Sequence, residues 1–98
     1  MIDVSKISGT GEYTEKTELK NEKKRVLYYK GEKVFLVVNN NTIEVRTDAE
    51  LRKLLVEKYE SVMDSRYFGK GGVEIVLAGK QFSDSEIDDL VRLSYNLS

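Results

Sequence analysis

The stretch from residue 25 to residue 46 constrains the fold most, because it holds three β-strand patterns separated by two turn signals. The runs R-V-L-Y-Y-K and K-V-F-L-V-V-N are rich in β-branched and aromatic residues, which favour strands. Gly31 and Glu32 separate them, with glycine first as a type II′ hairpin turn requires. Three asparagines at 39–41 mark the second turn, because asparagine tolerates positive φ. The run T-I-E-V-R then alternates, so the stretch predicts a three-stranded antiparallel meander.

The middle run of this meander has an unusual pattern. Residues 34–38 are all apolar, with no alternation between apolar and polar positions. A strand that is apolar at both parities is typically central or covered on both faces. In the third run, by contrast, Ile43 and Val45 should point inward and their neighbours outward.

A helix is predicted directly after the meander. Thr47 and Glu50 match a capping box, in which the threonine hydroxyl accepts the N–H of Glu50 and the glutamate side chain reaches back. The apolar positions that follow at helical spacing, and that we expect to be buried, are Leu51, Leu54, Leu55 and Tyr59. A short strand around Val62, a glycine loop at residues 69–72 and a strand at residues 73–77 are predicted next.

A second helix is predicted at the end of the chain. Ser83 and Glu86 form another capping box, and Phe82 and Ile87 stand at the positions of a hydrophobic staple. The acidic residues in its first turns suit the positive end of the helix dipole and need no metal ion to explain them. Its expected buried stripe consists of Ile87, Leu90, Val91, Ser94 and Leu97.

The order of elements is therefore β-β-β-α-β-β-α, in a chain of 98 residues that we expect to form one domain over residues 1–98. This order predicts an α+β fold, a two-layer sandwich with an antiparallel sheet and both helices on one face. Residues 1–23 leave two alternatives open, a mobile polar arm or an additional edge strand.

The inventory of side chains narrows the chemistry. The sequence contains no cysteine and no histidine, which removes the commonest thiolate nucleophile, acid–base group and transition-metal ligands. We expect no enzyme activity, no catalytic residue, no metal site and no cofactor. The longest apolar run has five residues and the start lacks a signal-peptide pattern, so we expect a cytoplasmic protein with no membrane partner.

The glycine-rich run G-K-G-G at residues 69–72 does not match a phosphate-binding loop. It has neither Walker spacing nor the third glycine of a dinucleotide fingerprint, and it leads into a strand rather than a helix. We interpret it as a turn in which glycine provides positive φ.

Two basic segments are the candidate binding residues. The run K-N-E-K-K-R at residues 20–25 is the densest positive segment, although the net charge of the chain is −1. The run S-R-Y-F-G-K at residues 65–70 combines cations with aromatic rings, as nucleic-acid sites do. The candidate nucleic-acid-binding residues are Lys20, Lys23, Lys24, Arg25, Arg66, Tyr67 and Lys70. The alternative is that the cations are merely solvated and that Phe68 belongs to the core.

A different class of function also fits. An apolar sheet face and an open edge strand would suit a protein-interaction or homo-oligomerisation domain, with a protein partner or a second copy and no nucleic-acid role. Binding to DNA or RNA remains the leading hypothesis.

Several runs resemble the MmcQ/YjbR-like family over about residues 31–98. They are G-E-K-V-F-L-V-V, I-E-V-R-T-D-A-E-L-R-K-L-L, S-R-Y-F-G-K and F-S-D-S-E-I-D-D-L-V-R-L-S-Y-N-L. The resemblance implies a curved antiparallel sheet with helices on one side, and a DNA-binding role. The family's asparagine and tryptophan near the loop are not matched, since Gly69 and Val73 stand there, and residues 1–23 do not read as the family's first helix.

Overall fold

The computed structural model describes residues 3–7 and 9–98, with the backbone alone at Lys20. Six strands form one antiparallel sheet in the order β1-β2-β3-β4-β6-β5. The strands are β1 (Thr14–Lys20), β2 (Lys23–Lys30), β3 (Lys33–Val38), β4 (Thr42–Arg46), β5 (Val62–Ser65) and β6 (Gly69–Val76). The helices are α1 (Ala49–Lys58) and α2 (Asp84–Leu97), with 3-10 turns η1 (Val4–Lys6) and η2 (Leu77–Gly79).

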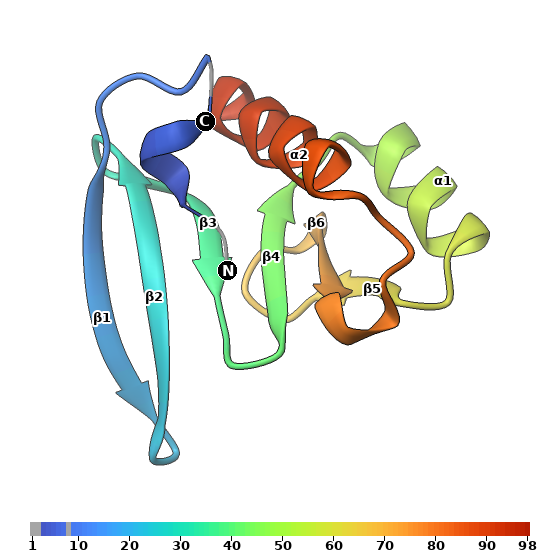
Figure 1. Cartoon of the computed structure of the whole chain (residues 1–98), viewed down its shortest axis with the longest axis horizontal. Coiled ribbons are helices and arrows are strands. Elements are labelled where there is room, and N and C mark those ends of the chain that lie inside the picture. The colour runs from blue at the N-terminus through green and yellow to red at the C-terminus, as the bar shows by residue number, and fades with distance from the viewer. Residues whose placement is uncertain (1–2, 8) are drawn as a thin grey trace.

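Both helices cover the same face of the sheet (Figure 1). α2 packs on β3 and β4, and α1 packs on β6 and β5. The core between the layers joins Leu55 of α1 and Val91 of α2 to fully buried strand residues such as Phe35, Ile43 and Val73. The chain is therefore an α+β two-layer sandwich, as its order of elements predicted.

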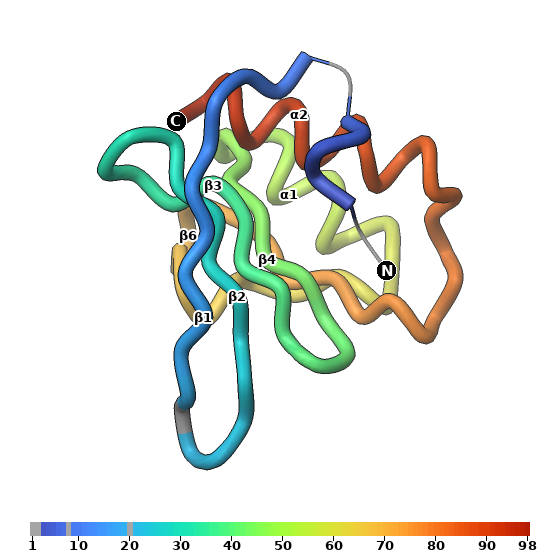
Figure 2. The backbone as a smooth tube through the Cα atoms, turned by 60° about the vertical axis from the view of Figure 1, so that its left-hand side comes forward, coloured from blue at the N-terminus to red at the C-terminus, as the bar shows by residue number. Residues whose placement is uncertain are grey.

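The N-terminal segment forms the edge strand rather than a mobile arm at residues 14–20. β1 pairs with β2 through a two-residue turn, in which Asn21 and Glu22 have φ of 54° and 64°. Positive φ at both central residues is the mark of a type I′ hairpin turn. This hairpin extends beyond the rest of the sheet in both views (Figures 1 and 2). At the next turn Gly31 has φ of 62°, as the type II′ prediction requires.

α1 begins differently from the prediction. Asp48, not Thr47, is the N-cap, and its carboxylate accepts the N–H of Leu51 at 2.7 Å. The prediction that Leu54 is buried is also wrong, because its side chain is 57% exposed while Leu55 is buried. The residues of α1 that pack on the core are Leu51, Leu55 and Val56, and Leu54 lies outside the face that they define.

α2 confirms the second capping box, with both Ser83–Glu86 hydrogen bonds present. Leu97 does not complete the buried stripe, because it is 46% exposed at the last turn. Tyr95 is buried instead, with its ring 5.0 Å from that of Phe35 and its hydroxyl donating to the carbonyl of Glu12. The ring contact ties α2 to β3, and the hydrogen bond ties α2 to the N-terminal segment.

Residues 69–72 are not a loop, because β6 begins at Gly69. Gly72 is required there by close packing, since a Cβ atom would lie 2.3 Å from the carbonyl oxygen of Val45 and 3.0 Å from the Phe68 side chain. The strand predicted at residues 73–77 ends at Val76, and Leu77 begins η2.

Candidate nucleic-acid interface

The helix-free face of the sheet has its own small apolar cluster. Leu27, Val34 and Val37 are buried there, packed by Tyr29 and Phe68. Phe68 belongs to the connection between β5 and β6 (residues 66–68, the β5–β6 segment), which supplies part of this cover. Residues 34–38 are therefore packed from both sides of the sheet, which confirms the interpretation of their unbroken apolar run.

A groove of about 450 Å³ lies beside this cluster. Three segments that are distant in sequence form its walls: the β1–β2 hairpin, the β3–β4 turn and the β5–β6 segment. The lining residues are Asn21, Lys23, Lys24, Arg25, Asn39, Asn40, Asn41, Thr42, Glu44, Arg66 and Tyr67. Its size falls in the usual range for ligand sites.

Arg25 connects the hairpin to the β5–β6 segment. Its guanidinium group forms an ion pair with Glu18, its cross-strand neighbour on β1. The same group lies 5.5 Å from the centre of the Tyr67 ring, within cation–π distance. Burial, the largest cause, and the neighbouring Tyr29 raise the pKa of Tyr67, so the ring remains a neutral phenol at physiological pH.

Arg66 is held by a buried carboxylate on β6. Its Nε and Nη2 atoms donate to the two carboxylate oxygens of Glu74 at 2.9 and 2.7 Å, and the hydroxyl of Thr42 donates to the same carboxylate at 2.7 Å. Burial, the largest single effect, raises the pKa of Glu74, but the hydrogen bonds from Arg66 and Thr42 and the charge of Arg66 together lower it below its ordinary value. Glu74 is therefore ionised and fixes the arginine at the groove.

Glu44 forms the floor of the groove and is 1% exposed. One of its carboxylate oxygens accepts the Ser65 hydroxyl and the Tyr67 backbone N–H, both at 2.8 Å. The other oxygen accepts the Asn39 amide at 2.9 Å. The carboxylate thus links β4 to the β3–β4 turn and to the segment that carries Tyr67, and it positions two walls of the groove.

The structure brings most of the candidate binding residues together. Lys23, Lys24, Arg25, Arg66 and Tyr67 all line the groove. Lys70 is exposed on β6 and is not among the lining residues. The side chain of Lys20 lies outside the described part of the chain. Sequence reasoning missed Glu44 and Glu74. The polar positions of T-I-E-V-R and V-E-I-V indicated only outward-facing carboxylates, and the residues that cover them come from other segments.

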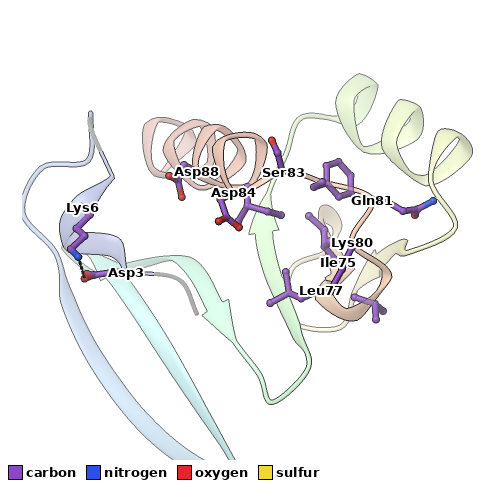
Figure 3. A pocket seen from close by; sticks show the side chains of 12 residues that line it. Asp3, Lys6, Ile75, Leu77, Lys80, Gln81, Ser83, Asp84 and Asp88 are labelled. Carbon is purple, nitrogen blue, oxygen red and sulfur yellow. Dashed lines mark ion pairs between the residues drawn. The ribbon is translucent and has the colours of Figure 1, made fainter.

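A second hollow, of about 620 Å³, lies between η1, η2 and the start of α2 (Figure 3). Its charges are mixed, because Lys6 and Lys80 share it with Asp3, Asp84 and Asp88. Lys6 already lies 4.0 Å from Asp3. Among the described residues no group of three or more acidic side chains is placed to hold a metal ion.

Comparison with known proteins gives no further guidance. No family model, curated protein or solved structure matches the chain. The resemblance to the MmcQ/YjbR-like family therefore stays a prediction. In the described part of the chain, no helix has the length and apolar character needed to cross a bilayer.

Proposed function

We propose that this protein is a non-enzymatic module that binds single-stranded nucleic acid weakly, without reading its sequence, in the groove on the helix-free face. The observation that carries the proposal is that residues 23–25 and Arg66–Tyr67, some forty residues apart in the chain, line one groove. Cations beside an exposed aromatic ring are what a phosphate backbone with splayed bases requires. The proposal includes a cytoplasmic location, where nucleic acid is available.

Lys23 and Lys24 would neutralise phosphates of the nucleic acid. Arg25 and Arg66 already have carboxylate partners, Glu18 and Glu74. Lys23 and Lys24 are exposed, and within the described residues no ion pair engages them. Each phosphate held by a lysine releases counterions, so a lysine pair should give affinity that depends strongly on salt.

Tyr67 would provide the stacking surface. It is 39% exposed, and its backbone is fixed by the Glu44 carboxylate. The ring is also braced at 5.0 Å by Phe68, so little side-chain entropy would be lost when a base stacks on it. The asparagines of the β3–β4 turn add amide groups that can bond to phosphate or base without preference.

The test is fluorescence anisotropy with a labelled single-stranded oligonucleotide at low salt. For a pair of lysine–phosphate contacts, affinity should fall by about 25-fold for each tenfold rise in salt. The double variant Lys23→Glu with Lys24→Glu should abolish binding. The double variant Lys33→Glu with Lys53→Glu changes the net charge equally at exposed positions outside the groove, and should retain most of the affinity.

Two results would refute the proposal. One is the absence of binding by the wild-type protein at low salt and tens of micromolar. The other is an equal loss of affinity in both double variants, which would show that net charge rather than the groove attracts the oligonucleotide.

A further inference from the structure

The outer edge of β1 is open. β1 is the first strand of the sheet and pairs only with β2 among the described strands. In both views no other helix or strand of the described residues lies alongside that edge (Figures 1 and 2). Unpaired N–H and C=O groups along such an edge can pair with another strand.

The geometry of the hairpin turn determines which residues of β1 have backbone N–H and C=O groups that point away from β2, here called outward groups. A two-residue turn closes on a hydrogen-bonded pair, here Lys20 and Lys23, and the two kinds of pair then alternate along the strands. Counting back from the turn, the N–H and C=O groups of Glu15, Thr17 and Leu19 point away from β2. These outward residues are spaced symmetrically about Thr17.

We propose that β1 pairs antiparallel with β1 of a second copy of this chain, with Thr17 opposite Thr17. In this register Glu15 lies opposite Leu19 of the second copy, and every outward N–H finds an outward C=O. Lys16 then lies opposite Glu18 of the second copy, and the two-fold symmetry repeats this pair. A shift of the register by two residues would place Glu18 opposite Glu18 or Lys16 opposite Lys16, so the charges select the register centred on Thr17.

The charges on β1 favour this pairing rather than prevent it. Charged side chains, especially lysine, protect many edge strands from association, but opposite charges that meet across two strands stabilise the pairing. On β1, Lys16 and Glu18 share the helix-free face with Leu27 and Arg25 of β2, because cross-strand partners lie on one face. Glu18 would therefore lie between Arg25 of its own chain and Lys16 of the second copy, in a row of alternating sign.

The pairing also accounts for an exposed apolar side chain. Leu19 is 69% exposed near the end of a hairpin that extends beyond the body of the protein. Opposite Leu19 the second copy would place the methylene groups of Glu15. The two six-stranded sheets would join into one, with their helix-free faces on the same side. This inference is independent of nucleic-acid binding, and its test uses none.

A charge exchange across the β1 edge tests the register. In sedimentation velocity from micromolar to millimolar concentration, the wild-type protein should shift from monomer to dimer. Lys16→Glu and Glu18→Lys should each raise the dimer dissociation constant by about tenfold, because two attractive pairs become two repulsive ones. An equimolar mixture of the two variants should associate about as tightly as the wild type, since the mixed dimer restores both pairs.

Controls separate this effect from folding and net charge. Lys33→Glu changes the charge by the same amount away from the β1 edge and should dimerise like the wild type. Glu18→Lys also removes the partner of Arg25, so its fold is checked by circular dichroism. Among the described residues Lys16 forms no ion pair, so Lys16→Glu removes none. A wild-type protein that stays monomeric at millimolar concentration, or a mixture that associates no better than either variant alone, would overturn the proposal.

Discussion

Glu44 on β4 and Glu74 on β6 are direct cross-strand partners, and each is only 1% exposed. Two like charges opposite each other are normally destabilising, and burial adds a desolvation cost. The two carboxylates are tolerated because each is saturated by separate donors. Glu74 accepts from Arg66 and Thr42, and Glu44 accepts from Ser65, Tyr67 and Asn39. This pair holds the walls of the groove in place.

Arg66→Met should destabilise the protein, because Glu74 would keep its buried charge without a cation and beside Glu44. We expect a loss of about 1–3 kcal/mol in the free energy of unfolding, less than for a fully buried ion pair because the Arg66 side chain is 74% exposed. Urea unfolding measures the change. Lys33→Met, which removes an exposed cation, is the control and should stay within about 0.5 kcal/mol of the wild type. Equal effects of the two substitutions would contradict the role of Arg66.

Stability should fall in acid in a way that depends on Glu74. Its pKa in the folded protein lies below the ordinary value of 4.5, so the folded state binds fewer protons than the unfolded chain in this range. The resulting stability is fully present above that ordinary value and is lost as the pH falls through the folded pKa. In Glu74→Gln the acid-induced loss of unfolding free energy should be smaller than in the wild type. Glu57→Gln, on the exposed side of α1, should leave the slope unchanged, and an unchanged slope in Glu74→Gln as well would refute this assignment.

Ser94→Ala should weaken the attachment of α2 to the sheet. The buried Ser94 hydroxyl donates to the carbonyl of Phe35 on β3 and accepts the N–H of Arg46 on β4. Removing it leaves both backbone groups buried without this partner, which should cost about 1–3 kcal/mol. Thermal or urea unfolding provides the measurement. Ser85→Ala, at an exposed position of the same helix, should have little effect, and a similarly small effect at Ser94 would contradict the hydrogen-bond assignment.

Gly72→Ala should be among the most damaging single substitutions. The added methyl group would lie 2.3 Å from the Val45 carbonyl oxygen, so β4 and β6 would have to separate. We expect a loss of about 3 kcal/mol or more, or failure to fold. Gly71→Ala is the matched control, because its Cβ would meet only the Phe68 carbonyl oxygen, at 3.3 Å. If the Gly71 variant is the less stable of the two, the packing at Gly72 has been misassigned.

Much of the sheet and both helices could be predicted because their signals are local. The turns at Gly31 and residues 39–41, and the capping box at Ser83, lie within a few residues of the elements that they define. Which face of a helix is buried depends less on neighbouring residues and more on the elements that the helix packs against. Leu54 and Leu55 both fitted the predicted apolar face, but only Leu55 is buried, and the burial of Tyr95 depends on Phe35 and Glu12 far away in the chain.

The groove could be predicted only in part. Its cations stood out as basic segments, but nothing in the sequence indicated that the β1–β2 hairpin and the β5–β6 segment lie beside each other. That proximity arises because residues 66–68 lie over the helix-free face of the sheet, where Phe68 packs on the Leu27, Val34 and Val37 cluster and the Tyr67 ring lies 5.5 Å from the Arg25 guanidinium. The pairing of β4 with β6 sets Glu44 opposite Glu74, a relationship between residues thirty positions apart.

The most direct test of the central claim is a ¹⁵N-resolved NMR titration of the wild-type protein with a short single-stranded oligonucleotide at low salt. We expect the largest shifts at the backbone amides of residues 23–25, 39–41 and 66–67, with α1 unaffected. Saturable shifts confined to α1 and α2, or no shifts at all, would contradict this claim.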